Sequence, residues 1–388
     1  MVIERIELNH FRNYDRLVLE PHEGINIFFG QNGSGKTNLL EAIHYCGLGK
    51  SHRITQDINA VQMGASGCSC RLSVKNRLSR NDLEIRLQPG DESVKSVWID
   101  QKRAARLSEM MGVLRCVIIS PEDLDLIKDG PSVRRRFLDM MISQISRPYF
   151  IALQQYRTAM NQRSAILRKA RLENTRIDPM IEDFEAAMCE QAKLICGERI
   201  KYTGELAQAG HTLYQQISGK ESEDFLIQYR PSVREFQEDP SSLLHRLKES
   251  REEDLKNGTT SAGPHRDDLL LSLNQKSMKL YASQGQMRTG ALSLKLAQMR
   301  IYQQTVQDQP VLLLDDVMSE LDLERRMNLL RVMDGVQTFI TCSDEGDLAS
   351  WQNHRTYEVK NLKGSASIEI RKQGSEKPAV SWSEPIFE

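Results

Sequence analysis

One short segment constrains the fold of this chain more than any other. Residues 30–37 read Gly-Gln-Asn-Gly-Ser-Gly-Lys-Thr and match the G-x-x-x-x-G-K-[ST] pattern of a phosphate-binding loop. The apolar run Ile25–Phe29 before the loop predicts a buried strand, and apolar residues at helical spacing between positions 39 and 48 predict a helix after it. Because a loop of this type joins a strand to a helix, the segment predicts an α/β fold.

The chemistry of this loop follows from its residue types. Glycines let the backbone curl so that its N–H groups face phosphate oxygens, and the N-terminus of the next helix adds partial positive charge. We expect Lys36 to reach the β- and γ-phosphates of ATP and the Thr37 hydroxyl to ligate Mg²⁺. The alternative, a glycine-rich turn without nucleotide, does not explain the strand and helix on either side. The expected ATP-binding residues are Gly30, Gln31, Asn32, Gly33, Ser34, Gly35, Lys36 and Thr37.

A second segment supplies the carboxylates that such a site needs. The apolar residues 311–314 predict a buried strand that ends in Asp315 and Asp316. We expect Asp315 to join the metal shell and Asp316 to orient or deprotonate the attacking water. A strand that ends in two acids is a weak signal alone, since many buried strands do so. Together with the phosphate loop it indicates a nucleotide hydrolase.

The residues Ser283, Gln284, Gly285 and Gln286 stand at the head of a predicted helix, upstream of the acidic strand. Ser283 fits an ordinary N-cap serine, which is the simpler interpretation. The same step also matches the signature motif of ABC ATPases, in which the serine grips the γ-phosphate bound by the other subunit. Ser319 and Asp322 follow the acidic strand at the place of the dimer-contacting D-loop. The order of these elements predicts a composite site, with Lys36, Asp316 and Ser283 as catalytic residues.

Several segments together resemble one family, the RecF proteins, which are bacterial recombination-repair ATPases of the ABC and SMC-like class. The resemblance covers about residues 3–344 and lies in Phe11–Tyr14, the phosphate loop, Ser120–Leu124, Arg134–Asp139, Gly263–Asp268, Ser283–Arg288 and Leu313–Asp322. It implies ATP-dependent dimerisation, DNA binding and slow hydrolysis, and work with RecR and RecO in loading RecA at gapped DNA. It also implies roles in replication-fork maintenance and the SOS response. By resemblance, Arg12 and Asn13 lie near the nucleotide, and Gly263–Asp268 lies near the junction of two lobes or forms a turn before a strand.

Two positions depart from transporter-type ABC proteins, which usually carry glutamate after the strand aspartate. This chain has Asp316, whose side chain is one methylene shorter, in keeping with a slow switch. In place of their switch histidine it has residues 341–344, Thr-Cys-Ser-Asp. A sensor of the γ-phosphate in this segment would have to be a hydroxyl.

A basic segment is the candidate for DNA contact. Residues 131–176 hold ten lysines and arginines against two acids, in a chain of net charge −1. Such a cluster can neutralise phosphates without reading sequence, although for any single arginine a solvated helix face or an internal ion pair is the simpler explanation. No aromatic residues alternate with the cations, so we expect recognition of the backbone of duplex or of duplex–single-strand junctions. The expected DNA-binding residues are Arg134, Arg135, Arg157, Arg163, Arg168, Lys169 and Arg171.

The remaining composition excludes some classes of protein. No run approaches the ~18 apolar residues that a membrane span needs, and the N-terminus predicts a strand instead of a signal peptide. The seven cysteines are scattered, and Cys68 and Cys70 alternate on one face of a predicted strand. Free thiols in a reducing cytoplasm are therefore expected.

The predicted organisation is an ABC-type P-loop ATPase head with a mixed sheet, antiparallel N-terminal strands and an inserted compact helical lobe. Its expected segments are 1–125 (first half of the ATPase lobe), 126–262 (basic helical lobe), 263–375 (signature helix, acidic strand, D-loop and closing strands) and 376–388 (a loose tail). A long-armed SMC protein is a poor alternative, because about 280 residues without sustained heptads separate Lys36 from Asp315. A transporter subunit would not need the basic insertion, and a P-loop small-molecule kinase would not need Ser283 or the D-loop.

Overall fold

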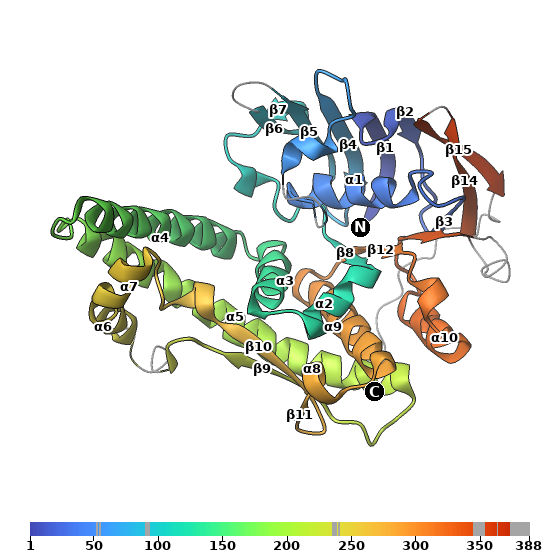
Figure 1. Ribbon diagram of the computed structural model, residues 1–388. Helices are drawn as coiled ribbons and strands as arrows, with labels where there is room; N and C mark the ends of the chain where they lie inside the picture. Colours follow the sequence, from blue (N-terminus) through green and yellow to red (C-terminus); the bar gives the residue numbers. More distant parts are fainter. Residues whose placement is uncertain are drawn as a thin grey trace. The chain divides into compact units, whose positions relative to one another are not determined.

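The computed structural model describes residues 1–51, 53, 56–89, 94–234, 239, 241–343, 354–362 and 364–372 (Figure 1). The chain forms two compact units. Unit 1 comprises Met1–Ala105, Val113–Pro121 and Asp308–Glu388, and unit 2 comprises Arg106–Gly112 and Glu122–Gln307. An α/β domain split by an inserted lobe, as the sequence predicts, has this connectivity.

The structure moves one predicted boundary. Residues 263–307, which we grouped with the acidic strand, belong to unit 2. The reason is strand pairing, because Asp268–Leu273 forms an antiparallel ladder with Phe225–Arg230 of the inserted lobe. The predicted boundary at residue 125 lies close to the observed change at Pro121. The predicted tail 376–388 lies outside the described residues.

Unit 1 contains an antiparallel sheet made from the N-terminal strands. Its order is β2-β1-β4-β5-β6-β7. Side chains alternate between the two faces, and Cys68 and Cys70 both point to the buried face of β4, as predicted. The strands are β1 (Val2–Phe11), β2 (Tyr14–Leu19), β4 (Cys68–Lys75), β5 (Arg80–Gln88), β6 (Val94–Ile99) and β7 (Lys102–Arg103).

A second, mixed sheet in unit 1 carries the phosphate loop. Its order is β15-β14-β3-β13-β12-β8, and all neighbours are parallel except β14 and β15. Strands β12 and β13 are buried at every residue, as expected of parallel strands covered on both faces. The strands are β3 (Ile25–Phe29), β8 (Cys116–Ile119), β12 (Val311–Asp315), β13 (Thr338–Cys342), β14 (His354–Leu362) and β15 (Ser365–Lys372).

Helix α1 (Lys36–Leu48) lies between the two sheets of unit 1. It contacts β1, β4 and β5 of the antiparallel sheet and β8, β12 and β13 of the mixed sheet. Because both sheets cover it, the helix is buried almost all round and lacks a clear polar face. Unit 1 also contains α10 (Leu323–Val332), whose N-cap Asp322 accepts a hydrogen bond from the main chain of Arg325.

Unit 2 is built on long helices. α5 (Ile181–Ser218) packs against α4 (Arg147–Glu173) and α9 (Gln284–Val306). Pro148 lies in the first turn of α4, and Asn174 ends α4 in the left-handed conformation. The other helices are α2 (Asp125–Lys128), α3 (Pro131–Ser143), α6 (Ser242–Glu249), α7 (Arg251–Asn257) and α8 (Met278–Tyr281).

A small sheet, β11-β10-β9, packs on α5. Its strands are β9 (Phe225–Arg230), β10 (Asp268–Leu273) and β11 (Lys276–Ser277). The charged stretch before β10 contains α7, whose Asp254 is fully buried. Asp254 is buried because it pairs with Arg163 of α4, a partner 91 residues away in sequence.

Candidate phosphate-binding site

The phosphate loop leaves the end of β3 and closes into α1. Gly30, Gly33 and Gly35 have φ angles of 153°, 79° and 118°, which favour glycine. A Cβ on Gly30 would collide with the main-chain oxygen of Val359, and one on Gly35 would lie 2.8 Å from the amide of Asn13. The glycines are therefore required by neighbouring chain segments as well as by the curl of the loop.

The loop presents hydrogen-bond donors and positive charge to one place. Gly35 caps α1 without a side-chain bond, and no acidic residue stands in the first helical turn, so the N–H groups and positive end of the helix are not neutralised there. The Ser34 hydroxyl is buried and has no partner among the described residues. The Lys36 ammonium donates to the carbonyls of Gly30 (2.6 Å) and Gln31 (3.0 Å). This donor set fits the phosphates of a nucleotide.

Lys36 is itself almost buried, with 7% of its surface exposed. Burial lowers the pKa of its ammonium, and the nearby carboxylates of Asp316 and Asp315 oppose that shift. The lysine therefore lies in a pocket that disfavours an uncompensated positive charge, and a polyphosphate would compensate it.

The two acids lie where the sequence predicts, at the end of β12. The Thr37 hydroxyl donates to Asp315 Oδ1 at 2.8 Å. An aspartate beside the loop threonine supplies the hard oxygen ligands that Mg²⁺ prefers, so these two residues fit a magnesium site. Asp316 has a φ of +56°, in the left-handed region, which is uncommon for a residue other than glycine and typical of functional sites.

Thr341 holds both acids, and sequence analysis did not assign it this role. Its hydroxyl donates to Asp315 Oδ1 at 2.7 Å and accepts the main-chain N–H of Asp316 at 2.9 Å. The parallel register pairs Asp315 with Thr341 on the neighbouring strand. A hydroxyl at the end of a buried strand was the available signal, but strand order is needed to use it. The Thr341 residue is 1% exposed and its hydroxyl is engaged with the two acids. Ser343 is the other described residue of segment 341–344 that carries a hydroxyl, and Asp344 lies outside the described residues.

Asn13 and Arg12 support the site in different ways. Asn13 donates to the main-chain oxygen of Ser34 at 3.2 Å and accepts a bond from Asn38 at 2.8 Å, so it braces the loop. Arg12 pairs at 3.1 Å with Glu41, a fully buried residue of α1. In this structure Arg12 fixes the helix, and its expected contact with nucleotide stays a prediction.

The signature residues begin α9 in unit 2. Ser283 and Gln286 form a capping box: the serine oxygen accepts Gln286 N–H at 3.3 Å, and the glutamine oxygen accepts Ser283 N–H at 2.9 Å. The N-cap interpretation of Ser283 is therefore confirmed. Ser283 and Gln284 are nevertheless exposed, while Gly285 and Gln286 are half-buried. Ser283 is therefore an N-cap residue that stays accessible to solvent.

The D-loop residues lie in unit 1, directly after Asp316. Ser319 donates to the main-chain oxygen of Asp316 at 2.9 Å, and Asp322 caps α10. Both side chains are exposed. The structure thus accounts for both as local caps, and their predicted contacts in a dimer stay predictions.

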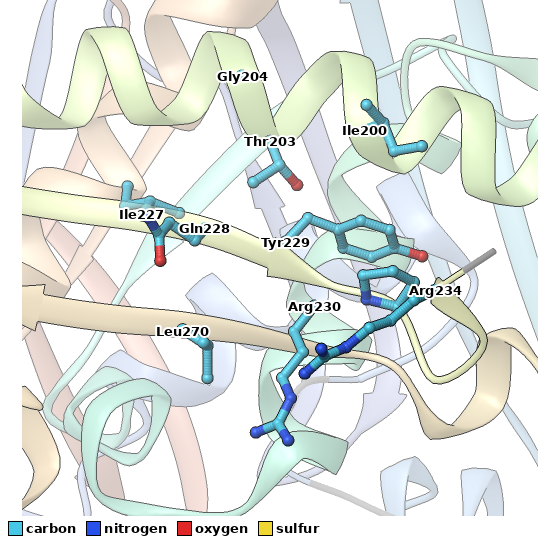
Figure 2. A pocket seen from close by; sticks show the side chains of 10 residues that line it. Ile200, Thr203, Gly204, Ile227, Gln228, Tyr229, Arg230, Arg234 and Leu270 are labelled. Atoms are coloured by element: carbon cyan, nitrogen blue, oxygen red, sulfur yellow. The ribbon is translucent and has the colours of Figure 1, made fainter. Parts of the chain in front are cut away.

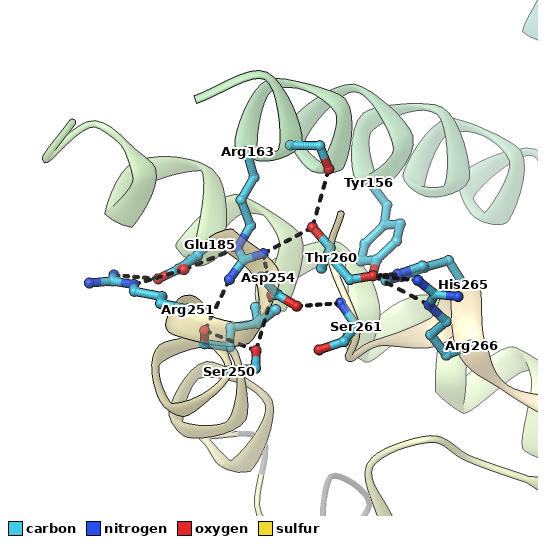
Figure 3. A network of polar contacts seen from close by, with 12 residues as sticks. Tyr156, Arg163, Glu185, Ser250, Arg251, Asp254, Thr260, Ser261, His265 and Arg266 are labelled. Atoms are coloured by element: carbon cyan, nitrogen blue, oxygen red, sulfur yellow. Dashed lines mark hydrogen bonds and ion pairs between the residues drawn. The ribbon is translucent and has the colours of Figure 1, made fainter. Parts of the chain in front are cut away.

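The structure corrects two of the predicted DNA contacts. Arg163 is fully buried, 2.7 Å from Asp254 and 3.1 Å from Glu185 (Figure 3). Arg134 is 8% exposed and makes paired bonds to Asp268 at 2.8 and 3.1 Å. Both guanidinium groups bond inside unit 2 and are largely withdrawn from solvent, because acids from distant parts of the sequence compensate their charge.

The remaining predicted cations reach the surface to different degrees. Arg135 is half-buried and donates to the main-chain oxygen of Asp267 at 2.6 Å. Arg157 is exposed and lies 3.2 Å from Asp139. Arg168, Lys169 and Arg171 are exposed near the C-terminal end of α4. The exposed cations of α4 are therefore the part of the predicted patch that phosphate could reach.

The described residues hold neither an all-protein metal cluster nor a membrane-spanning helix. No group of three or more histidine, cysteine, aspartate or glutamate side chains there could hold a metal ion. Within the same residues, no helix is long and apolar enough to cross a membrane. A magnesium ion at Thr37 and Asp315 would thus depend on nucleotide oxygens for further ligands.

Comparison with known proteins first defines a class. Residues 2–366 match the family model described as the RecF/RecN/SMC N terminal domain. The Smc head bound to the C-winged helix domain of ScpA covers 97% of this chain and 98% of that chain, with a TM-score of 0.57 and 14% identity. At that identity the likeness concerns the fold alone, which is that of an ABC-type ATPase head.

Closer matches narrow the class to one family. The DNA replication and repair protein RecF of Clostridium novyi (strain NT) is 37% identical, over 95% of this chain and 100% of that protein. RecF of Acetivibrio thermocellus is 38% identical, over 89% of this chain and 94% of that protein. A structure described as the recombination mediator protein RecF-ATP in the RecFOR pathway has a TM-score of 0.86 and 32% identity, covering 95% of this chain and 97% of that one. The chain belongs to the RecF family of DNA replication and repair proteins.

Proposed function

We propose that this chain is an ATP-dependent DNA-binding protein of recombinational repair, in which ATP and Mg²⁺ close a head-to-tail pair of identical chains on DNA. The observation that carries the proposal is the cluster at the phosphate loop, where Lys36 lies within the loop and Thr37 bonds to Asp315 at 2.8 Å. A relative in the same family is described as a recombination mediator bound to ATP. The proposal extends that binding to this chain.

The side chains take the following roles. Lys36 and the N-terminus of α1 bind the phosphates, and Thr37 and Asp315 hold the metal ion. Magnesium, when bound, neutralises phosphate charge. Asp316 orients or deprotonates the attacking water, and Thr341 keeps both acids in place through its two bonds. Because Asp316 is shorter than the glutamate usual in transporters, we expect slow hydrolysis that acts as a switch.

The second chain enters through Ser283. This serine is exposed and its backbone is fixed by the capping box, so its position is defined before any partner arrives. We propose that it contacts the γ-phosphate held by the other chain, with Ser319 and Asp322 beside it. This arrangement makes hydrolysis depend on dimerisation.

DNA is the proposed substrate of the closed dimer. Arg157, Arg168, Lys169 and Arg171 are the exposed cations that support this part of the proposal. They would contact the backbone of a gapped duplex or a duplex–single-strand junction. By family, the dimer would help RecR and RecO to load RecA, and hydrolysis would release it.

The test uses two variants of the full chain. The solution mass of Asp316→Asn is measured with and without ATP–Mg²⁺ and with a short gapped duplex, and we expect a nucleotide-dependent dimer that retains DNA. Ser283→Arg should bind ATP as a monomer and fail to dimerise. If Ser283→Arg dimerises with ATP as the wild type does, the composite site is refuted. Full ATPase activity in that monomer would instead indicate an ordinary P-loop enzyme.

A further inference from the structure

A groove in unit 2 is lined by none of the residues assigned above to nucleotide or DNA. Its volume is about 620 Å³, within the range of sites that hold a few side chains of a ligand (Figure 2). One wall comes from α5 and the other from β9 and its neighbour β10. The lining residues used below are Ile200, Thr203, Gly204, Ile227, Tyr229 and Leu270.

The groove follows the free edge of β9. The sheet order is β11-β10-β9, and among the described residues no other strand pairs with β9. Phe225 of β9 is paired with Leu273 of β10. At the next position along the ladder, the main-chain N–H of Asn274 donates to the main-chain oxygen of Asp224 at 2.8 Å. Because bonded positions alternate along an antiparallel ladder, the main-chain groups of Ile227 and Tyr229 point away from β10. Both residues line the groove, which therefore contains unpaired strand groups.

The walls of the groove also carry exposed apolar side chains, a buried hydroxyl and a helical glycine. Ile200 and Leu270 are 38% and 39% exposed, which is high for large apolar side chains. The Thr203 hydroxyl is buried and finds no hydrogen-bond partner among the described residues. Gly204 lies inside α5, and a Cβ there would meet no atom within 4 Å. A glycine in a helix is less favourable than alanine, and close approach by another main chain is a reason to keep it.

Two arginines stand at the rim beside Tyr229 (Figure 2). Arg230 ends β9 and Arg234 follows it, and both are exposed. Asp268 is opposite Arg230 in the ladder, but its carboxylate is bonded to Arg134. Within the part of the chain that the structure describes, neither rim arginine has an ion pair or a side-chain hydrogen bond. Unpaired guanidinium groups are suited to carboxylates, which they can bind with two parallel bonds.

We propose that this groove binds an extended acidic segment of a partner protein, which adds a strand to the edge of β9. The segment's main chain would bond to Ile227 and Tyr229, its apolar side chains would cover Ile200 and Leu270, and its carboxylates would meet Arg230 and Arg234. Nucleic acid also attracts arginines, but it has no peptide groups to pair with a strand edge. The apolar walls and the ladder groups therefore favour a peptide.

The experiment titrates the full chain with a fluorescein-labelled octapeptide of alternating valine and glutamate, followed by anisotropy. We expect saturable binding and slower hydrogen exchange in the peptide fragment that contains Ile227 and Tyr229. Replacing the glutamates by lysines, or methylating alternate backbone nitrogens, should weaken binding at least about tenfold, because the first removes carboxylates and the second removes ladder donors.

The protein variants separate the two contributions. Arg230→Glu with Arg234→Glu should weaken the acidic peptide about tenfold, whereas the control Arg176→Glu on another exposed segment should not. Gly204→Gln should block the groove, and because it raises helix propensity it should not lower the urea midpoint, which is measured alongside binding. Equal binding of the acidic and lysine peptides, or undiminished binding by Gly204→Gln, overturns the proposal. The proposal is also overturned if duplex DNA displaces the peptide and the Arg230 and Arg234 variants bind that DNA more weakly. It is equally overturned if the wild type dimerises without nucleotide and the same variants are monomers.

Discussion

The role of Thr341 can be tested by removing its hydroxyl alone. Thr341→Val keeps the shape of the side chain but deletes one bond to the Asp315 carboxylate and one to the Asp316 main chain, at 2.7 and 2.9 Å. A hydrogen bond to a charged group contributes about 1.5–3 kcal/mol. If about 2 kcal/mol of this is lost in the transition state because Asp316 is no longer held, hydrolysis should slow roughly thirtyfold.

The assay is single-turnover ATP hydrolysis with the ATP affinity measured separately. Thr341→Ser should restore most of the rate, since it keeps the hydroxyl. The matched control is Thr338→Val in the same strand, whose fully buried hydroxyl donates to Val336 (3.1 Å), away from the acids. Both valine variants should lose about 1–2 kcal/mol of unfolding free energy, but only Thr341→Val should lose the rate. Hydrolysis by Thr341→Val within threefold of the wild type, at normal ATP affinity, would refute the assignment.

Two further predictions concern unit 2. Arg163→Met should lower the free energy of unfolding by about 3–5 kcal/mol, because it leaves Asp254 buried without a cation, whereas Glu185 keeps its pair with Arg251. The exposed Arg168→Met should change the free energy of unfolding by less than about 0.5 kcal/mol but should weaken DNA binding. Urea titrations and DNA binding in low salt measure the two effects, and the same result for both variants would contradict both expectations. His265 lies between the Tyr156 hydroxyl (2.8 Å) and the Thr260 carbonyl (2.9 Å), and burial lowers its pKa from 6.5 to about 4. Since only the unfolded chain then takes up the proton, stability should fall by roughly 3 kcal/mol as pH drops from about 6.5 to 4. His265→Gln should show a shallower fall in urea midpoints over that range, and an equal fall in both proteins would contradict the pKa assignment.

Sequence was sufficient where the signal is local. The residues of the phosphate loop, the strand that ends in Asp315 and the capping step at Ser283 each lie within eight positions, so spacing alone predicts their geometry. The strand and helix order of unit 1 follows from the same periodicity. These parts of the fold and of the site agree with the structure.

Sequence was insufficient where a side chain depends on a distant partner. Arg163 looks like its exposed neighbour Arg168 in the sequence, but its partners stand 22 and 91 positions away and bury it. The role of Thr341 depends on β13 lying beside β12, an order that no local pattern predicts. The free edge of β9 likewise becomes visible only when the strands are paired.

The order in which strands meet in unit 1 has a consequence for synthesis on the ribosome. Strand β3, which leads into the phosphate loop, has β13 and β14 as its neighbours, and their registered residues lie more than 300 positions later. Most of unit 2, residues 122–307, is continuous and can fold as it emerges. We therefore expect the nucleotide site to be the last part of the growing chain to form. Until β13 has left the tunnel, the apolar strand Ile25–Phe29 lacks both neighbours, and this interval is when a nascent chain would most need a chaperone.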